Sequence, residues 1–204
     1  MKLNIMVLTK EQENQINLQI EAYEKQIGSE TVIVWSNGLE LIIDPYVANP
    51  NIQNSGVQLV QYLSDNPHLV KGKIVTDMGT GSGIIGISAA LLGARKINLI
   101  DIDPRAVKNV KKNIAKHKLQ DKCNVFLSDL FGEFSSRELS DVQIFNHPYF
   151  SVEPIRGKEW TRMMLGGTKL IADYLTQAPK YSTKTALYIL SWLPLAENES
   201  GIDN

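Results

Sequence analysis

Apolar and polar positions follow a helical period near the N-terminus and a strand period soon after it. Residues 9–27 place apolar side chains on a partial stripe among Glu, Gln and Lys, and Gly28 is a suitable end for this helix. Two β-rich runs follow, residues 31–35 and 39–43, with Ser36-Asn37-Gly38 between them. Asn-Gly between apolar runs predicts a hairpin, because both residues tolerate positive φ.

From Lys73 onward, strand-like and helix-like segments alternate. The predicted strands cover residues 73–78, 96–101, 123–129, 141–146 and 185–193. Helices are predicted over 84–94 and 104–119 and within 166–182, and an earlier helix over 56–65 has Ser55 as its expected cap. This alternation predicts an α/β fold, a doubly wound and mostly parallel Rossmann-like sheet flanked by helices. Residues 54–204 are expected to form this domain, and residues 1–53 an N-terminal helix and hairpin appendage on the substrate side.

Length, charge and cysteine content narrow the class of protein. A chain of 204 residues suffices for one well-buried domain, and a net charge of −1 argues against a nonspecific nucleic-acid binder. Cys123 is the single cysteine, so no internal disulfide can form and a cytoplasmic location is expected. The N-terminus lacks the apolar core of a signal peptide, and no window reaches the roughly 20 apolar residues of a membrane span. No membrane partner is expected.

The segment VTDMGTGSGIIGISAA joins the first predicted strand of the sheet to a helix. The strand ends at Asp77, and Gly79, Gly81 and Gly83 alternate after it. Glycine permits positive φ and lets a ligand approach the backbone, and free N–H groups at a helix start suit an anionic or polar group. Gly81, Gly83 and Gly86 also satisfy G-x-G-x-x-G, the dinucleotide fingerprint. A cofactor site is therefore expected here, and a turn without a ligand is the alternative.

Acidic residues follow the next two predicted strands. Asp101 lies about 20 residues beyond the glycines, where a carboxylate can accept hydrogen bonds from both ribose hydroxyls of an adenosine ligand. Asp103 precedes Pro104 and is expected to cap the following helix. Asp129, in LSDLF, is placed to accept from the exocyclic amine of an adenine ring. The alternatives are a second capping acid for Asp101 and a plain turn acid for Asp129.

With DMGTGSGIIGISAA, DIDPRAVKNVKKN, LSDLF and IFNHPYF in this order, the chain resembles the class I S-adenosylmethionine-dependent methyltransferases over roughly residues 54–192. It looks most like the group with an Asn-Pro-Pro-Tyr motif after the fourth strand. That group includes the release-factor glutamine methyltransferases, the small-domain ribosomal-RNA guanine methyltransferases and the adenine-N6 enzymes. The resemblance implies S-adenosyl-L-methionine as the cofactor.

The resemblance also assigns roles to residues. The implied cofactor-binding residues are Asp77, Gly79, Thr80, Gly81 and Gly83 around the methionine part, Asp101 at the ribose, and Ile102, Asp129 and Leu130 at the adenine. Asn146 would accept from the target NH2, Pro148 would help supply a backbone carbonyl for the same group, and Tyr149 would pack on a planar substrate. Further substrate contacts are expected from His147, Phe150, Arg156 and Trp160.

The implied reaction is methyl transfer to a planar nitrogen. Two acceptors that hold both N–H groups out of plane favour the pyramidal geometry that attack requires, and the transfer then depends on positioning. The methyl acceptor stays open between a protein glutamine amide, as in release factors or ribosomal proteins, a base amine in RNA or DNA, and a small molecule. Two other functions stay open: an NAD(P)-dependent oxidoreductase, and a degenerate methyltransferase fold that binds cofactor or a partner without turnover.

Three features depart from the family pattern. His147 stands where the motif has its first Pro, so an N–H is restored and the loop loses a rigid residue; neutral substitution, altered substrate choice and lost activity are open alternatives. Only LAENESGIDN follows TALYILSWLP, so the C-terminal helix and reversed hairpin of the class are expected to be missing. The loop after the motif mixes Arg156, Lys158 and Arg162 with Trp160, which suits an anionic or nucleobase substrate or a solvated loop. No His, Cys and Asp cluster has metal-ligand spacing.

Overall fold

A five-stranded parallel sheet forms the centre of the molecule. The computed structural model describes residues 10–27, 32–36, 38–52, 54–134, 139–150 and 152–190. The sheet has the strand order β5-β4-β3-β6-β7, and every neighbouring pair in it is parallel. Its strands are β3 (Ile74–Met78), β4 (Lys96–Asp101), β5 (Cys123–Leu127), β6 (Ser140–Phe145) and β7 (Ser182–Leu190). The chain order reverses between β3 and β6, which is where doubly wound sheets bind ligands.

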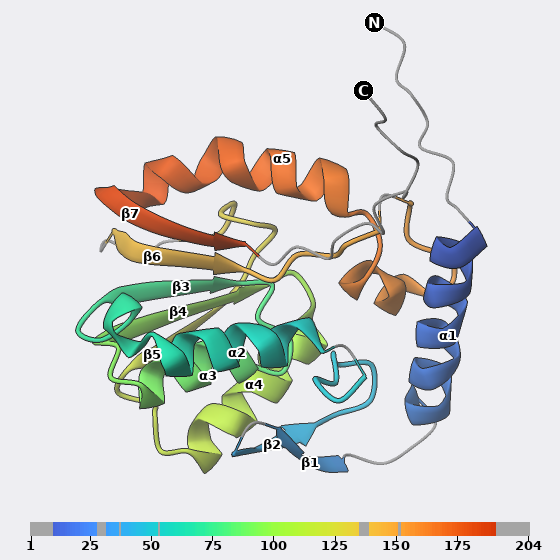
Figure 1. Ribbon diagram of the computed structural model, residues 1–204, viewed down its shortest axis with the longest axis horizontal. Helices are drawn as coiled ribbons and strands as arrows, with labels where there is room; N and C mark the ends of the chain where they lie inside the picture. The colour runs from blue at the N-terminus through green and yellow to red at the C-terminus, as the bar shows by residue number, and fades with distance from the viewer. Residues whose placement is uncertain are drawn as a thin grey trace, which may run out of the picture.

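Helices cover both faces of this sheet (Figure 1). One face carries α2 (Ser55–Asp65), α3 (Ile84–Leu91) and α4 (Pro104–Lys116), and the other carries α5 (Gly167–Gln177). Short 3-10 turns, η1 (Pro67–Leu69), η2 (Glu159–Met163) and η3 (Ala178–Tyr181), lie in the connections. This arrangement confirms the predicted α/β class with a mostly parallel, helix-flanked sheet.

The sheet forms because its central strands can be buried on both faces. All five residues of β3 are buried, as are the four middle residues of β4. Continuous apolar runs of this kind are typical of parallel strands covered by helices on each side. α4 presents Ala106, Val110 and Ile114 to the core at a spacing of four residues, and Asp103 caps its first turn by accepting from the Arg105 amide at 2.8 Å.

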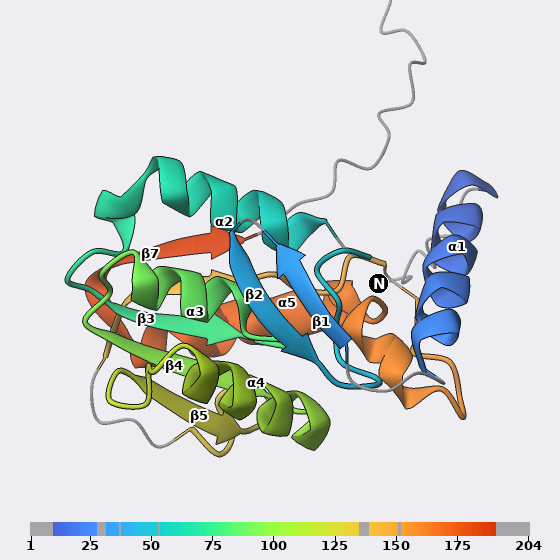
Figure 2. The same ribbon diagram turned by 90° about the horizontal axis from the view of Figure 1, so that it is seen from below.

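The second strand of the N-terminal hairpin contributes to the core of the domain. β1 (Val32–Ser36) pairs antiparallel with β2 (Leu39–Ile43). Figure 2 shows the two strands near α4, on the face of the sheet that carries α2, α3 and α4. Leu39, Leu41 and Ile43 are buried in the same apolar cluster as α2, α3 and the sheet. The predicted boundary at residue 53 therefore does not separate two packing units, because β2 contributes to the main core.

Two asparagines of α4 bind the free edge of β2. The Asn113 side chain accepts from the Ile42 amide at 2.7 Å and donates to the Ile42 carbonyl at 2.9 Å and to the Ser82 carbonyl at 2.9 Å. Asn109, one turn earlier, accepts from the Asp44 amide at 2.7 Å and donates to the Ile42 carbonyl at 3.0 Å. Both asparagine residues are fully buried, and their side chains satisfy backbone groups on the edge of β2 that β1 does not pair.

The helix α1 (Lys10–Ile27) packs against η2 rather than against the sheet (Figure 1). Its buried residues Ile16, Ile20 and Tyr23 form a separate apolar cluster with Trp160, Met164 and Leu165. The rings of Tyr23 and Trp160 have centroids 5.8 Å apart, and Lys158 forms an ion pair with Glu24. α1 therefore supports the segment that follows residues 146–150, the loop after β6, which we call the substrate loop because of its expected role.

Several local expectations differ from the structure. Ser55, the predicted cap of α2, is the first residue of that helix, and Asn54 occupies the cap position without a side-chain cap bond. The Ser55 hydroxyl is buried with no hydrogen-bond partner in the described part of the chain. The last strand begins at Ser182, three residues before the predicted start, and residues 191–193 of the predicted strand lie outside the described residues. The expected loss of C-terminal strands concerns residues 191–204, which lie outside the described residues. None of the described helices is long and apolar enough to cross a membrane.

The bonds from Asn113 to β2 should contribute measurably to stability. Asn113→Ala removes three hydrogen bonds to buried backbone groups, so we expect the free energy of unfolding in urea to fall by about 3 kcal/mol, at about 1 kcal/mol per bond. Lys111→Ala, on the exposed face of the same helix, is the control and should change it by less than about 0.5 kcal/mol. Equal stability of the two variants would contradict this account of how β2 is held.

Candidate active site

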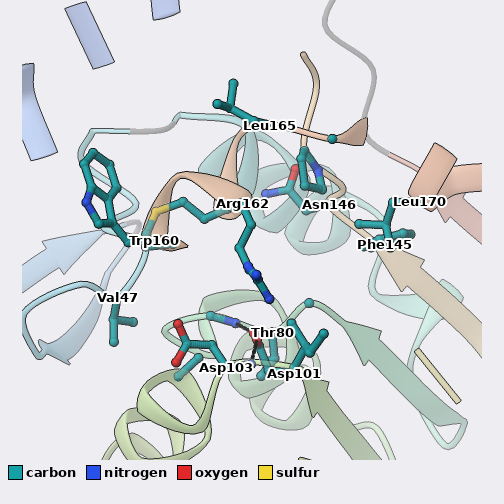
Figure 3. A pocket seen from close by; sticks show the side chains of 18 of the residues that line it. Val47, Thr80, Asp101, Asp103, Phe145, Asn146, Trp160, Arg162, Leu165 and Leu170 are labelled. Atoms are coloured by element: carbon teal, nitrogen blue, oxygen red, sulfur yellow. Dashed lines mark hydrogen bonds between the residues drawn. The ribbon is translucent and has the colours of Figure 1, made fainter. Parts of the chain in front are cut away.

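A cavity of about 650 Å³ lies at the carboxyl ends of the central strands. Its floor consists of the glycine-rich turn after β3 and the acidic residues after β4, and one side consists of the ends of β6 and α5. The loop 46–50 and the segment after the substrate loop complete it. Figure 3 shows Trp160, Arg162 and Leu165 above the floor residues Thr80, Asp101 and Asp103. We refer to residues 159–166 as the roof segment.

The glycine-rich turn requires glycine for two separate reasons. Gly81 has φ of +54°, and its amide donates to the Asp101 carboxylate at 2.8 Å. Gly83 has φ of +88°, and a Cβ there would lie 2.5 Å from a methyl carbon of Val110. A side chain at either position would strain the backbone, and at Gly83 it would also push α4 away. The turn thus lies close under the cavity with its backbone accessible to a ligand.

Asp77 lies beneath this turn and does not line the cavity. The carboxyl group is 1% exposed and accepts from the Thr80 hydroxyl at 2.7 Å and from the Gly86 amide at 3.0 Å. Burial raises its pKa to about 7, against the lowering effect of the two hydrogen bonds. The side chain therefore orders the turn and the start of α3 from below, whereas Thr80 and Gly81 face the cavity.

Asp101 ends β4 at the cavity floor. One carboxylate oxygen accepts from the Gly81 amide and the other accepts from the Asp103 amide at 2.9 Å. The Asp101 side chain therefore links the turn after β3 to the segment after β4. Burial raises the pKa of Asp101 to about 6. Partial burial also acts to raise the pKa of Asp103, but the hydrogen bonds from Arg105 and the charges of Arg105 and Arg162 lower this pKa overall. Asp103 caps α4 as expected, and its side chain also lines the cavity.

The residues expected around an adenine ring lie in the same cavity. Ile102, Asp129 and Leu130 all line it, and Ile102 is 43% exposed, as expected of an apolar side chain that can cover a flat ligand. Leu130 is buried and has a positive φ of +49°, which turns the chain sharply after Asp129. An apolar pair with a neighbouring carboxylate fits a purine with an exocyclic amine.

The substrate loop after β6 contains two internal hydrogen bonds. The Tyr149 hydroxyl donates to the Asn146 side-chain oxygen at 2.7 Å. His147 Nδ1 lies 2.7 Å from the Pro148 carbonyl, and because a carbonyl only accepts, this nitrogen carries the hydrogen. A Cβ on Gly167 would lie 1.8 Å from the Pro148 oxygen, so α5 can approach this carbonyl only through a glycine.

These bonds place the predicted loop residues differently with respect to the cavity. Asn146 and Pro148 line it, whereas His147 and Tyr149 do not. His147 is 7% exposed between the rings of Phe145 and Tyr149, each with its centroid 5.7 Å away, and its Nε2 has no partner among the described residues. In this structure Tyr149 therefore orients the Asn146 amide, instead of presenting its ring to the cavity.

The remaining predicted substrate contacts, in the loop after the motif, differ in whether they reach the cavity. Trp160 lines the cavity from the roof segment, but Arg156 is exposed and does not line it. The Phe150 carbonyl accepts from the amides of Gly166 and Gly167, which ties the substrate loop to the roof segment and to the start of α5. Arg162 lines the cavity as well, although sequence reasoning gave Arg156 the larger role.

The loop 46–50 forms one wall of the cavity, which was not predicted from the sequence. Tyr46 and Asn49 line the cavity, and Asn49 is held by the Tyr23 hydroxyl, which accepts from its amide at 3.3 Å. The segment has no periodicity that would indicate a site. Within the described residues no group of three or more His, Cys, Asp or Glu is arranged to bind a metal ion.

Comparison with known proteins identifies relatives of the central segment. A family model described as ribosomal protein L11 methyltransferase (PrmA) matches residues 58–147. A ribosomal protein L11 methyltransferase of Carboxydothermus hydrogenoformans is 42% identical over 109 residues, which are 53% of this chain and 35% of that protein. A putative protein N5-glutamine methyltransferase of Methanocaldococcus jannaschii is 36% identical over 118 residues, 58% of this chain and 55% of that protein. The chain thus spans about a third to a half of the length of these relatives.

Solved structures show the same fold. The T. thermophilus 16S rRNA N2 G1207 methyltransferase, in complex with AdoMet and guanosine, superposes with a TM-score of 0.59 over 79% of this chain and 41% of that chain, at 18% identity. The ribosomal protein L11 methylase of Lactobacillus delbrueckii gives 0.55 over 79% of both chains, at 20% identity. The chain therefore has the Rossmann-like fold of class I methyltransferases, and its central segment is similar to ribosomal protein L11 methyltransferases.

Burial of Asp77 predicts a pH dependence of stability. Between the usual Asp pKa of 3.8 and about 7, the folded protein keeps a proton that the unfolded chain releases. The corresponding stabilisation is complete below the lower value and is lost as the pH rises through the upper one. Asp77→Asn removes this titration. Between about pH 5 and about pH 8 the Tm of wild type should therefore fall relative to that of the variant.

Asp121→Asn, at an exposed turn, is the control and should keep a constant Tm difference from wild type over this range. A constant difference for Asp77→Asn as well would show that the buried carboxyl does not titrate as described.

Proposed function

We propose that this protein is an S-adenosylmethionine-dependent methyltransferase that modifies a nitrogen atom of a protein. The observation that carries the proposal is the placement of Asp101 and Asn146 around one cavity, at the ends of β4 and β6 on either side of β3. A carboxylate suited to a ribose and an amide suited to an N–H donor thus face the same volume. The relatives named for methylation of ribosomal protein L11 and of protein N5-glutamine support a protein acceptor.

The residues of the floor fit the cofactor by chemistry and shape. Asp101 would accept from the ribose hydroxyls, and Ile102 and Leu130 would enclose the adenine with Asp129 at its amine. The turn at Thr80 and Gly81 would lie under the methionine portion, where Gly81 has no side chain to obstruct it. When bound, the cofactor supplies an electrophilic methyl group on a sulfonium.

The substrate loop is suited to orienting a nitrogen nucleophile. The hydrogen bond from Tyr149 fixes which way the Asn146 side-chain oxygen faces, and the hydrogen bond from His147 fixes the Pro148 carbonyl. A carbonyl oxygen has two lone pairs, so the Pro148 carbonyl can still accept an N–H. Two fixed acceptors at the end of β6 would hold a planar amide or an amine with its lone pair toward the methyl group, which is catalysis by positioning.

The proposed acceptor is a protein, and RNA is the runner-up. The rRNA methyltransferase shares the fold at 18% identity, which does not extend to its substrate. The net charge of −1 gives no general attraction to nucleic acid. A nicotinamide-dependent oxidoreductase has little support, because the Asn146 to Tyr149 loop would have no role in hydride transfer.

Cofactor binding can be tested by calorimetric titration with S-adenosylhomocysteine and with NAD. We expect binding of the first and none of the second, and Asp101→Asn should weaken it about tenfold or more through loss of charge-assisted hydrogen bonds. Because the pKa of Asp101 is about 6 in the unliganded protein, the wild-type affinity should fall as the pH drops below about 6. Asp121→Asn is the matched control. Binding of NAD alone would refute the proposed function.

Methyl transfer can be tested with tritiated S-adenosylmethionine and a cell extract. Asn146→Ala should lower incorporation at least about a hundredfold, as removal of one key polar contact in an active site does, while S-adenosylhomocysteine affinity stays within about twofold. Asn66→Ala, after α2 and outside the cavity, should label as wild type does. Protease should release the label if the acceptor is a protein. Label released by ribonuclease would exclude the protein acceptor, and full activity of Asn146→Ala would exclude its role.

A further inference from the structure

Arg162 extends from the roof segment across the cavity. Its side chain points from η2 toward the floor, which contains Thr80, Asp101 and Asp103 (Figure 3). The residue is exposed and lines the cavity, so it is accessible from the cavity. The positive charge of Arg162 contributes to the low pKa of Asp103. A cation from the roof thus faces the part of the floor assigned to the cofactor.

Arg162 and Lys169 differ in how the acids of the cavity neutralise their charges. Among the described lining residues, five carboxylates face two cations, Arg162 and Lys169. Lys169 Nζ lies 2.6 Å from the Asp173 carboxylate, and the charges of Asp129 and Glu153 also act on it. Lys169 is therefore matched by acids on its own side of the cavity. Arg162 has no ion pair with a described residue, so its charge is available to a ligand.

The backbone around Arg162 is held firmly while its side chain crosses open space. Thr161 is fully buried, donates its hydroxyl to the Lys158 carbonyl at 2.8 Å and accepts from the Ile155 amide at 2.9 Å. Trp160 packs on Tyr23 of α1. The position from which the Arg162 side chain starts is therefore defined, which lowers the entropy cost of using it to bind a ligand.

Building on the proposed function, we propose that Arg162 binds the α-carboxylate of the cofactor's methionine portion. This carboxylate is the one anionic group of S-adenosylmethionine and of S-adenosylhomocysteine. Their methionine portion would lie over the turn at Thr80. Arg162 lines the same cavity as Thr80, and its side chain points toward the floor that contains Thr80 (Figure 3). A planar guanidinium can donate two parallel hydrogen bonds to a carboxylate.

Binding would then exchange one set of charges for another. The ribose hydroxyls would donate to the Asp101 carboxylate. The Arg162 guanidinium, which faces the acids of the floor in the unliganded protein, would donate to the cofactor carboxylate. Because Arg162 belongs to the roof segment, this contact would also connect the roof to the bound cofactor and help to exclude water from the site.

The test uses two ligands that differ in the carboxylate. S-adenosylhomocysteine carries the amino-acid portion, and 5′-methylthioadenosine lacks it while keeping the adenosine and the sulfur. By calorimetric titration of the full chain, Arg162→Ala should weaken S-adenosylhomocysteine about tenfold to a hundredfold, the usual effect of losing a hydrogen bond to a charged group. The affinity for methylthioadenosine should change less than about twofold. Arg162→Lys keeps the positive charge but not the planar pair of donors, so its affinity for S-adenosylhomocysteine should lie between those of wild type and Arg162→Ala.

Arg156→Ala is the control for the loop, because Arg156 is exposed and does not line the cavity, and the affinity for both ligands should be retained. Equal losses for both ligands in Arg162→Ala would overturn the proposal and indicate a general effect on the roof. An unchanged affinity for S-adenosylhomocysteine would overturn it as well. If wild type binds neither adenosine compound, the proposed function fails, and this inference fails with it.

Discussion

The buried carboxyl of Asp77 is the interaction on which the site depends. It accepts from Thr80 on one side of the glycine-rich turn and from Gly86 on the other, so one side chain determines how the chain passes from β3 into α3. Burying an acid is costly, and this burial raises the pKa of Asp77 to about 7. The cost is tolerated because the turn would otherwise have few restraints: its glycines adopt positive φ and have no side chains to pack. Asp101 then extends the same order to β4 by accepting from Gly81.

Much of the fold could be predicted from the sequence, because parallel strands covered on both faces are continuous apolar runs that end at Gly or Asp. The strand 96–101 was predicted with its observed bounds, and Asp101 was placed at the cavity for the same reason. The attachment of β2 to α4 could not be predicted. Asn109 and Asn113 look like solvated positions in a Lys-rich helix, and their partners at Ile42 lie about 70 residues away in the chain. Side-chain bonds to a distant backbone leave no period in the sequence.

The same limit explains what was uncertain about the substrate loop. His147 in place of Pro suggested a loop with more freedom, because the rigid ring and its fixed φ are absent. In the structure a hydrogen bond from Nδ1 to the next carbonyl restrains the loop instead, and the ring is enclosed by Phe145 and Tyr149. This restraint has a cost, since the buried Nε2 is an acceptor without a partner in the described chain. Whether a substitution loosens a loop thus depends on neighbours that the sequence does not place.

The N-terminal residues divide between two tasks. The second strand of the hairpin shares the main core, whereas α1 packs on Trp160, Met164 and Leu165 in a cluster that contains no strand of the large sheet. The roof segment is also bonded to Phe150 of the substrate loop, through the Gly166 amide. α1 is therefore connected through packing to both parts of the cavity, the roof that carries Arg162 and the loop that carries Asn146. Because this cluster is smaller and more peripheral than the core, its opening would require less free energy than opening of the core.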